Sequence, residues 1–138
     1  MTVKEFKFQY ALGALSRSAL ANFATNTTTP KYILTALAND KEYFIRKEIT
    51  KNCKTPVNAL ITLSKDKEWL IRMYTAENPN TPVEVLTKLS KDKNEYVRRD
   101  VAYNPNTPID ILIKLYKDKN YIVRESAKLV LIDKGIKV

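Results

Sequence analysis

The residues in this chain with the most evident chemistry are aspartates and arginines that recur as pairs. An arginine follows an aspartate by six residues at Asp40 and Arg46, Asp66 and Arg72, Asp92 and Arg98, and Asp118 and Arg124. A carboxylate can act as a general base, and an arginine can bind a phosphate. A catalytic residue is expected once in a chain, however, whereas this pair occurs four times. We therefore expect a structural role, in which the aspartate accepts the first N–H groups of a helix and the arginine donates to a neighbouring carboxylate or carbonyl.

The chain lacks the residue types on which many catalytic and metal sites depend. It contains no histidine, so Ser-His-Asp and Cys-His nucleophiles and histidine-containing metal sites are excluded. The single cysteine, Cys53, cannot form an internal disulfide. Although Lys51 and Lys54 are close in sequence, we interpret Cys53 as an ordinary loop cysteine and expect a reduced, cytoplasmic protein. We expect no cofactor.

Composition places the chain among single globular domains with an excess of positive charge. The 138 residues include 24 lysines and arginines against 15 aspartates and glutamates, which gives a net charge of +9. This length fits one domain. The charge is compatible with nucleic acid, an acidic protein or an anionic membrane surface as a partner. No apolar run is long enough to predict a membrane span.

A repeat of 26 residues accounts for most of the sequence. Thr-Pro pairs begin at Thr29, Thr55, Thr81 and Thr107. With the threonine as position 1, all four copies have leucine at positions 6 and 9, Asp-Lys at positions 12 and 13, and arginine at position 18. The repeat divides the chain into an N-terminal cap (1–28), four repeats (29–54, 55–80, 81–106 and 107–132) and a tail (133–138).

Each repeat predicts two short helices. In the third repeat, Thr81 is expected to cap the first helix, with Pro82 at its first position and Glu84 completing a capping box. Positions 5, 6 and 9 give this helix an apolar stripe, and Val97 and Val101 give the second helix its own. A pair this small buries too little apolar surface alone, so the repeats are expected to stack and to need caps at both ends.

The two ends of the chain are expected to provide those caps. At the N-terminus, apolar residues at helical spacing predict one capping helix, and they are Leu12, Leu15, Ala19, Leu20 and Phe23. At the C-terminus, Leu129–Ile132 continues the last helix, with Lys134 and Gly135 as its stop. This apolar run predicts either an inward-turned cap or a self-association surface.

The repeat resembles that of a known family. It is similar to the leucine-rich repeat variant family in the string Val97-Arg98-Arg99-Asp100-Val101-Ala102-Tyr103-Asn104-Pro105-Asn106-Thr107-Pro108, followed by Leu112 and Leu115. The spacing of Asp92 and Arg98 is also similar to that in HEAT repeats. The resemblance extends from residue 29 to about residue 132. It implies an all-α, right-handed superhelix of helical repeats, and it implies no reaction. An iron–sulfur cluster associated with one family member is not expected, because its cysteine cluster is absent here.

Residues that differ from copy to copy are the best candidates for binding. Positions 15, 19 and 22 or 23 face away from the buried side of the second helix, since successive residues rotate by about 100°. They are rich in the aromatic, methionine and arginine residues that interface cores favour. The candidate binding residues are Tyr43, Lys47, Lys51, Trp69, Met73, Arg99, Tyr103 and Tyr121. Alternatively, these aromatic rings pack between neighbouring repeats.

Lysines around the turn aspartates form a second candidate surface. Lys65, Lys67, Lys91, Lys93, Lys117 and Lys119 are expected to form a stripe along one edge of the stack, where they could follow a phosphate backbone. Each pair brackets an aspartate, however, so a solvated loop edge is the simpler interpretation.

The sequence therefore predicts binding rather than chemistry. We expect a non-enzymatic scaffold that contacts a protein partner through the variable face of the second helices. Nucleic acid, either DNA or RNA, bound by the basic surface is the alternative. An enzyme is the third and least favoured possibility. It would be a DNA glycosylase with Glu77 as its acid, near Trp69 and Met73.

Overall fold

The protein is entirely helical. A computed structural model describes all 138 residues and contains ten helices and no strands. The helices are α1 (Val3–Ala11), α2 (Arg17–Thr25), α3 (Lys31–Leu37), α4 (Tyr43–Lys51), α5 (Val57–Leu63), α6 (Trp69–Glu77), α7 (Val83–Leu89), α8 (Glu95–Tyr103), α9 (Ile109–Leu115) and α10 (Tyr121–Asp133). The predicted all-α class is confirmed. None of these helices combines the length and the apolarity that crossing a membrane requires.

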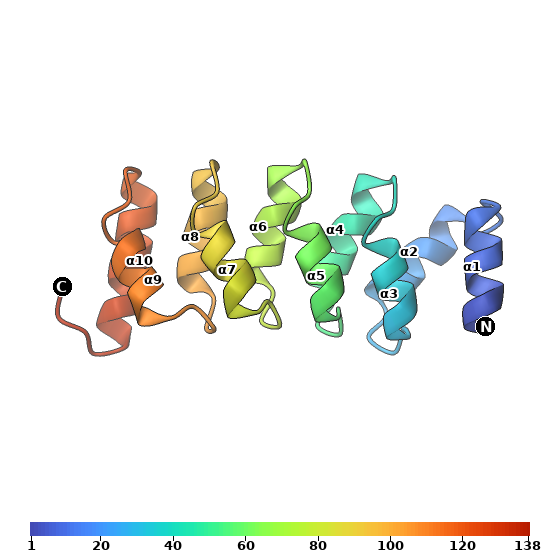
Figure 1. Cartoon of the computed structure of the whole chain (residues 1–138), viewed down its shortest axis with the longest axis horizontal. Coiled ribbons are helices and arrows are strands. Elements are labelled where there is room, and N and C mark those ends of the chain that lie inside the picture. The colour runs from blue at the N-terminus through green and yellow to red at the C-terminus, as the bar shows by residue number, and fades with distance from the viewer.

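The helices form a row of pairs with the two termini at opposite ends (Figure 1). From α3 onwards, a first helix of seven residues alternates with a longer second helix, and each helix begins 26 residues after its counterpart in the preceding pair. The second helices pack on one another in the order α4, α6, α8 and α10. The first helices lie on the face turned toward the viewer in Figure 1.

The apolar positions of the repeat form the core between these pairs. In the third repeat, the side chains of Val85, Leu86 and Leu89 on α7 are buried, as are those of Val97 and Val101 on α8. The predicted core stripes of both helices are therefore confirmed. Buried apolar residues from α1 to α6 make one cluster, and those from α6 to α10 make a second.

The first helix of each repeat begins differently from the prediction. Its N-cap in the third repeat is Pro82 rather than Thr81, and no side chain caps it, so the capping box with Glu84 does not form. The buried hydroxyl of Thr81 instead donates to the carbonyl oxygen of Thr75 in the preceding helix, at 2.5 Å. A residue before proline is driven to extended geometry, which carries the threonine away from the helix that follows. The equivalent donors are Thr55 to Ile49 and Thr107 to Val101.

The N-terminal cap consists of two helices rather than the single helix predicted from Leu12 onward. The chain is non-helical around Gly13, which has a positive φ of 65°, and α2 begins only after Ser16, whose hydroxyl caps it. Leu12 is 66% exposed, because it lies in this break rather than on a buried face. The unpredicted helix α1 contributes Phe6, which is fully buried.

The C-terminal helix ends where the sequence predicts. Gly135 has a positive φ of 77°, and its N–H donates to the carbonyl oxygen of Ile132 at 2.8 Å, which closes the last turn. In the run that continues the helix, Leu131 is fully buried, whereas Leu129 and Ile132 are exposed. The run therefore supplies an inward cap and also leaves apolar surface at this end, where self-association stays a prediction.

Candidate functional site

The repeated aspartates and arginines connect neighbouring repeats. Arg72 makes a bidentate pair with Asp92 of the next repeat, with Nε to Oδ2 at 2.7 Å and Nη2 to Oδ1 at 3.1 Å. Its Nη1 also donates to the carbonyl oxygen of Asp66 in its own turn, at 2.8 Å. Arg46 pairs with Asp66 and Arg98 with Asp118 in the same way. The expected role of the arginine is confirmed, and its carboxylate partner lies one repeat further along. The aspartate accepts the N–H of the N-cap residue, as Asp66 does from Glu68, rather than the first N–H groups of the helix itself.

Contact between the two partners shifts their pKa values in the direction that favours the charged form of each. The hydrogen bond to Asp92 raises the pKa of Arg72 above its usual value. Burial raises the pKa of Asp92, but hydrogen bonds from Arg72 and from the N–H of Asn94 outweigh burial, so the pKa of Asp92 is lowered overall. The pKa of Asp118 is lowered for the same reasons. Both partners therefore stay charged at neutral pH, and each pair compensates its own charge.

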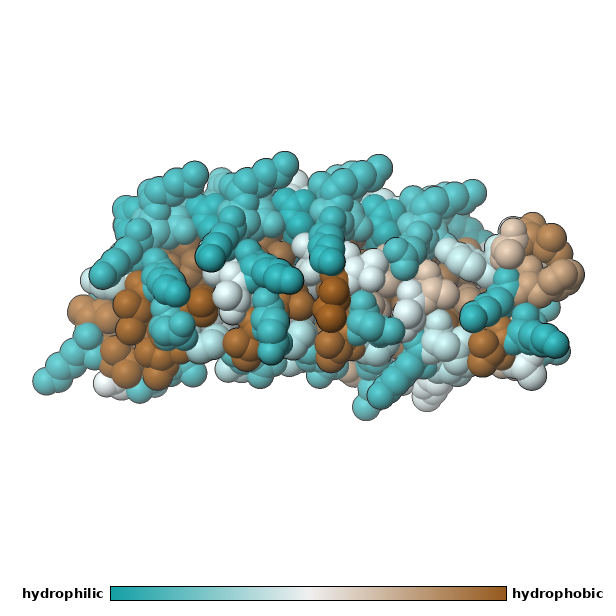
Figure 2. Space-filling model, in the orientation of Figure 1, coloured by the Kyte–Doolittle hydropathy of each residue, from teal (hydrophilic) through white to brown (hydrophobic).

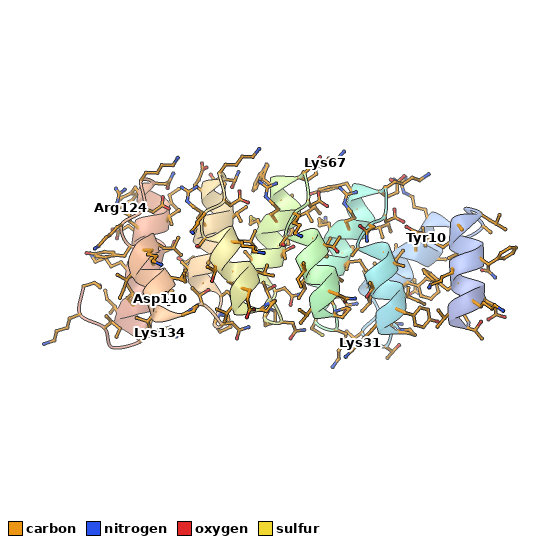
Figure 3. The ribbon with its side chains drawn as sticks, viewed as in Figure 1. Tyr10, Lys31, Lys67, Asp110, Arg124 and Lys134 are labelled. Atoms are coloured by element: carbon orange, nitrogen blue, oxygen red, sulfur yellow. The ribbon has the colours of Figure 1, made fainter.

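This ladder of pairs ends differently at the two ends of the molecule. At the N-terminal end, Asp40 accepts the hydroxyl of Tyr10 at 2.5 Å in place of an arginine. Burial and this hydrogen bond to a carboxylate both raise the pKa of the Tyr10 hydroxyl. At the C-terminal end, Arg124 donates only to the carbonyl oxygens of Asp118 and Lys119. Figure 3 labels Tyr10 and Arg124 near opposite ends of the row.

The side chains of the repeated asparagines are also hydrogen-bonded inside the fold. Asn78 donates from Nδ2 to the carbonyl oxygen of Thr50 at 2.7 Å and accepts the N–H of Asn80 on Oδ1 at 2.9 Å. Asn52 and Asn104 make equivalent bonds to Ala24 and Ala76. No buried side-chain nitrogen or oxygen lacks a partner. The recurring aspartates, arginines, asparagines and threonines are thus bonded inside the fold, whereas the recurring lysine at position 13 is exposed.

The variable residues of the second helices lie on one long face. Tyr103 and Tyr121 are 52% and 67% exposed, and Tyr43 and Trp69 are also exposed. All four cation–aromatic contacts of the molecule lie on these helices, and they are Lys47 over Phe44, Lys51 over Tyr74, Arg99 over Tyr96 and Arg124 over Tyr121. The face therefore interleaves positive charge with aromatic rings.

A cleft between α6 and α8 brings three of the candidate residues together. Met73, Arg99 and Tyr103 line a volume of about 320 Å³ with Glu77, Asp100 and Asn104. The guanidinium of Arg99 donates to Asp100 at 2.7 Å, and this hydrogen bond raises the pKa of Arg99. The cleft thus combines two apolar or aromatic side chains with charged groups of both signs.

A second cleft, between α4 and α6, contains a fourth candidate residue. Lys51 lines about 270 Å³ together with Cys53, Tyr74 and Glu77. The two clefts share Glu77, which ends α6, so they run along the same end of the second helices. Trp69, at the start of α6, lines neither of them. The glycosylase hypothesis places Glu77 near Trp69, and the structure separates these two residues by the length of the helix.

Trp69 follows the alternative interpretation of the aromatic residues. Its ring lies 5.7 Å from the ring of Tyr96 on the next second helix, with 32° between their planes, so it packs between repeats. Tyr96 itself was not a predicted candidate. Position 16 alternates aromatic and aliphatic residues, being Phe44, Leu70, Tyr96 and Ile122, and this alternation was the available signal.

The largest cleft lies at the N-terminal cap and is lined by none of the candidate binding residues. It encloses about 500 Å³ between α1, the start of α2 and the turn before α4, and its lining includes Tyr10, Leu15 and Leu20. Four of its polar side chains are paired, Tyr10 with Asp40 and Arg17 with Glu42. We assign it to the packing of the cap.

The lysines of the turns project from one edge of the molecule. Figure 2 shows this upper edge as a continuous hydrophilic band, and Figure 3 labels Lys67 on it. The lysines predicted to form a stripe are all exposed. The bracketing aspartates are not, because the side chains of Asp66, Asp92 and Asp118 are at most 10% exposed inside their arginine pairs. The solvated loop edge and the contact with a phosphate backbone therefore both stay predictions.

No family model matches the sequence, and no curated protein and no solved structure matches the chain.

Proposed function

We propose that this chain is a non-enzymatic scaffold that binds a protein through the outer face of its second helices. We infer that its pairs wind as a right-handed superhelix, as the resemblance to leucine-rich repeat variant and HEAT repeats implies. Support comes from the recurrence of helix boundaries every 26 residues and from the absence of any buried side-chain nitrogen or oxygen without a partner. Stacked helical repeats present extended surfaces of this kind.

The observation that carries the proposal is the cleft between α6 and α8. Its lining includes Met73 and the exposed Tyr103, and residues of these types are enriched in protein interfaces. The charged groups at its wall, Glu77, Arg99 and Asp100, are of both signs. Mixed charge complements a protein surface better than it complements a polyanion.

The test is capture of a partner from lysate treated with nuclease, followed by titration of the purified partner. Tyr103→Ser should weaken binding about 30-fold, the effect of removing one central aromatic side chain worth about 2 kcal/mol. Ile109→Ser is the matched control, since Ile109 is comparably exposed but lies on the first-helix face. Capture that disappears with nuclease, or an equal loss in both variants, would contradict a protein ligand on this face.

A further inference from the structure

The opposite end of the second helices carries uncompensated positive charge. Seven lysines of the turns are exposed, and they are Lys41, Lys65, Lys67, Lys91, Lys93, Lys117 and Lys119. The turn aspartates from Asp66 onward are buried against arginines, so they do not offset these lysines. The remaining acids here are the buried Asp40, which has no arginine partner, and three half-buried glutamates. The glutamates are Glu42, Glu68 and Glu95, and Glu42 already pairs with Arg17. The second helices also begin at this edge, which adds the positive ends of their dipoles.

Exposed aromatic rings follow the lysines in every repeat. Each second helix begins two residues after a turn lysine, and it has an aromatic residue at its first or second position. These rings are 37% to 67% exposed, and they are Tyr43, Phe44, Trp69, Tyr96 and Tyr121. Trp69 and Tyr96 join two successive repeats into one aromatic surface. The edge therefore repeats one unit, a lysine followed two or three residues later by an exposed aromatic residue, along the whole stack.

This repeated unit matches the chemistry of a nucleotide strand whose bases are unpaired. Lysines neutralise phosphates, and aromatic rings stack on the faces of bases whatever their identity. In a duplex those faces are covered by neighbouring bases, so only the lysines would find a partner, and an acidic peptide has no base to stack. We propose that this edge, formed by the turn lysines and the rings that follow them, binds single-stranded nucleic acid. It is separate from the clefts at the other end of the helices and goes beyond the protein-binding function.

The test uses the full chain and a labelled thymidine oligonucleotide of about 20 nucleotides, which exceeds common site sizes. Trp69 is the only tryptophan, so quenching of its fluorescence reports stacking at this edge. With one phosphate neutralised per repeat, affinity should fall about 50-fold between about 50 mM and about 200 mM salt. An oligonucleotide duplex of the same length and polyglutamate should bind more weakly and leave the fluorescence unchanged.

Two pairs of substitutions separate this edge from general electrostatics. Lys67→Ala with Lys93→Ala should weaken binding and make it less dependent on salt. Lys88→Ala with Lys114→Ala removes the same charge from exposed positions on α7 and α9 and should leave both properties nearly unchanged. Tyr121→Ala, at the most exposed ring, should weaken binding about 5-fold or more at every salt concentration.

The proposal is overturned by any of four results. These are no binding at about 50 mM salt, equal losses in the two lysine pairs, binding of duplex as tight as that of the single strand, and equally tight binding of polyglutamate. Tyr103→Ser should bind the oligonucleotide like the wild type. Failure of the nucleic-acid proposal is therefore distinguishable from failure of the protein-binding proposal. The lysine pairs and Tyr121 test the first, and Tyr103 tests the second.

Discussion

At the scale of single residues, most of the buried polar side chains that recur between copies bond across repeats. Arg72 pairs with Asp92, Asn78 reaches back to Thr50, and Thr81 reaches back to Thr75. Each bond joins groups that are buried, and leaving one partner unsatisfied costs about 1–3 kcal/mol, or more when it is charged. The residues that look most reactive in the sequence are thus the ones least free to react.

The paired aspartates predict a loss of stability in acid. Asp92 and Asp118 have lowered pKa values in the folded protein, so the unfolded chain binds protons more readily than the folded one. Their stabilising contribution is complete above the ordinary aspartate pKa and is lost as the pH falls through the lower, folded value. Thermal unfolding should therefore shift to lower temperature between pH 6 and pH 3.

A variant isolates this contribution. Asp92→Asn should lower the melting temperature at pH 6 and reduce its further fall toward pH 3, because one of the responsible carboxylates is gone. Asp110→Asn is the control, since Asp110 is exposed and makes no ion pair. The same acid sensitivity in Asp92→Asn as in the wild type would mean that the ladder does not govern it.

At the scale of the helices, packing rather than intrinsic preference holds the pairs together. A first helix of seven residues is too short to be stable alone in water. It persists because residues such as Leu86 and Leu89 are buried against the neighbouring helices. These elements are therefore sensitive to loss of side-chain volume at the buried positions and tolerant elsewhere.

Two positions on α7, one buried and one exposed, test this dependence. Leu86→Ala should lower the free energy of unfolding by about 2–5 kcal/mol, because it leaves a cavity in a fully buried position. Val83→Ala on the same helix should change it by about 0.5 kcal/mol or less, since Val83 is exposed. Chemical denaturation measures both, and similar losses in the two variants would show that the buried face of α7 is misassigned.

The repeat made the helices predictable, and its limits explain what was missed. Four copies fix the spacing of buried leucines, so both helices of each pair follow from the sequence. Thr81 was misassigned because threonine before proline resembles an N-cap, whereas its hydroxyl has a better acceptor in the preceding helix. Helix α1 and the break at Gly13 have no second copy, so only local signals indicated two helices, namely the capping box of Thr2 and Glu5 and the N-cap residue Ser16.

At the scale of the whole molecule, each pair contacts only its neighbours along the row. Interior pairs are supported on two sides and terminal ones on a single side. The candidate clefts lie among the interior helices α4, α6 and α8. The sequence predicted their residues from variability alone, but it could not tell that Trp69 packs on Tyr96 while Tyr103 stays free, because that depends on side-chain packing between repeats.

This arrangement predicts a gradient of local stability. Amide hydrogen exchange should be slowest in α6 and α8 and faster by at least about tenfold in α1 and at the end of α10, which are covered on one side only. Exchange measured by mass spectrometry or NMR resolves these segments. Uniform protection from α1 to α10 would indicate that the chain opens only as one unit, contrary to a chain of neighbour contacts.

Each of the three paired arginines contacts the aspartate of the following repeat. This contact restricts the ways in which the gene for such a chain can change in length. An upstream arginine meets a downstream aspartate whichever copies they come from, so duplication or deletion of one 26-residue unit recreates the same junction. An insertion of any other length would leave a guanidinium and a carboxylate buried without each other. Selection on those two groups alone would therefore keep the unit length fixed while the number of units varies freely.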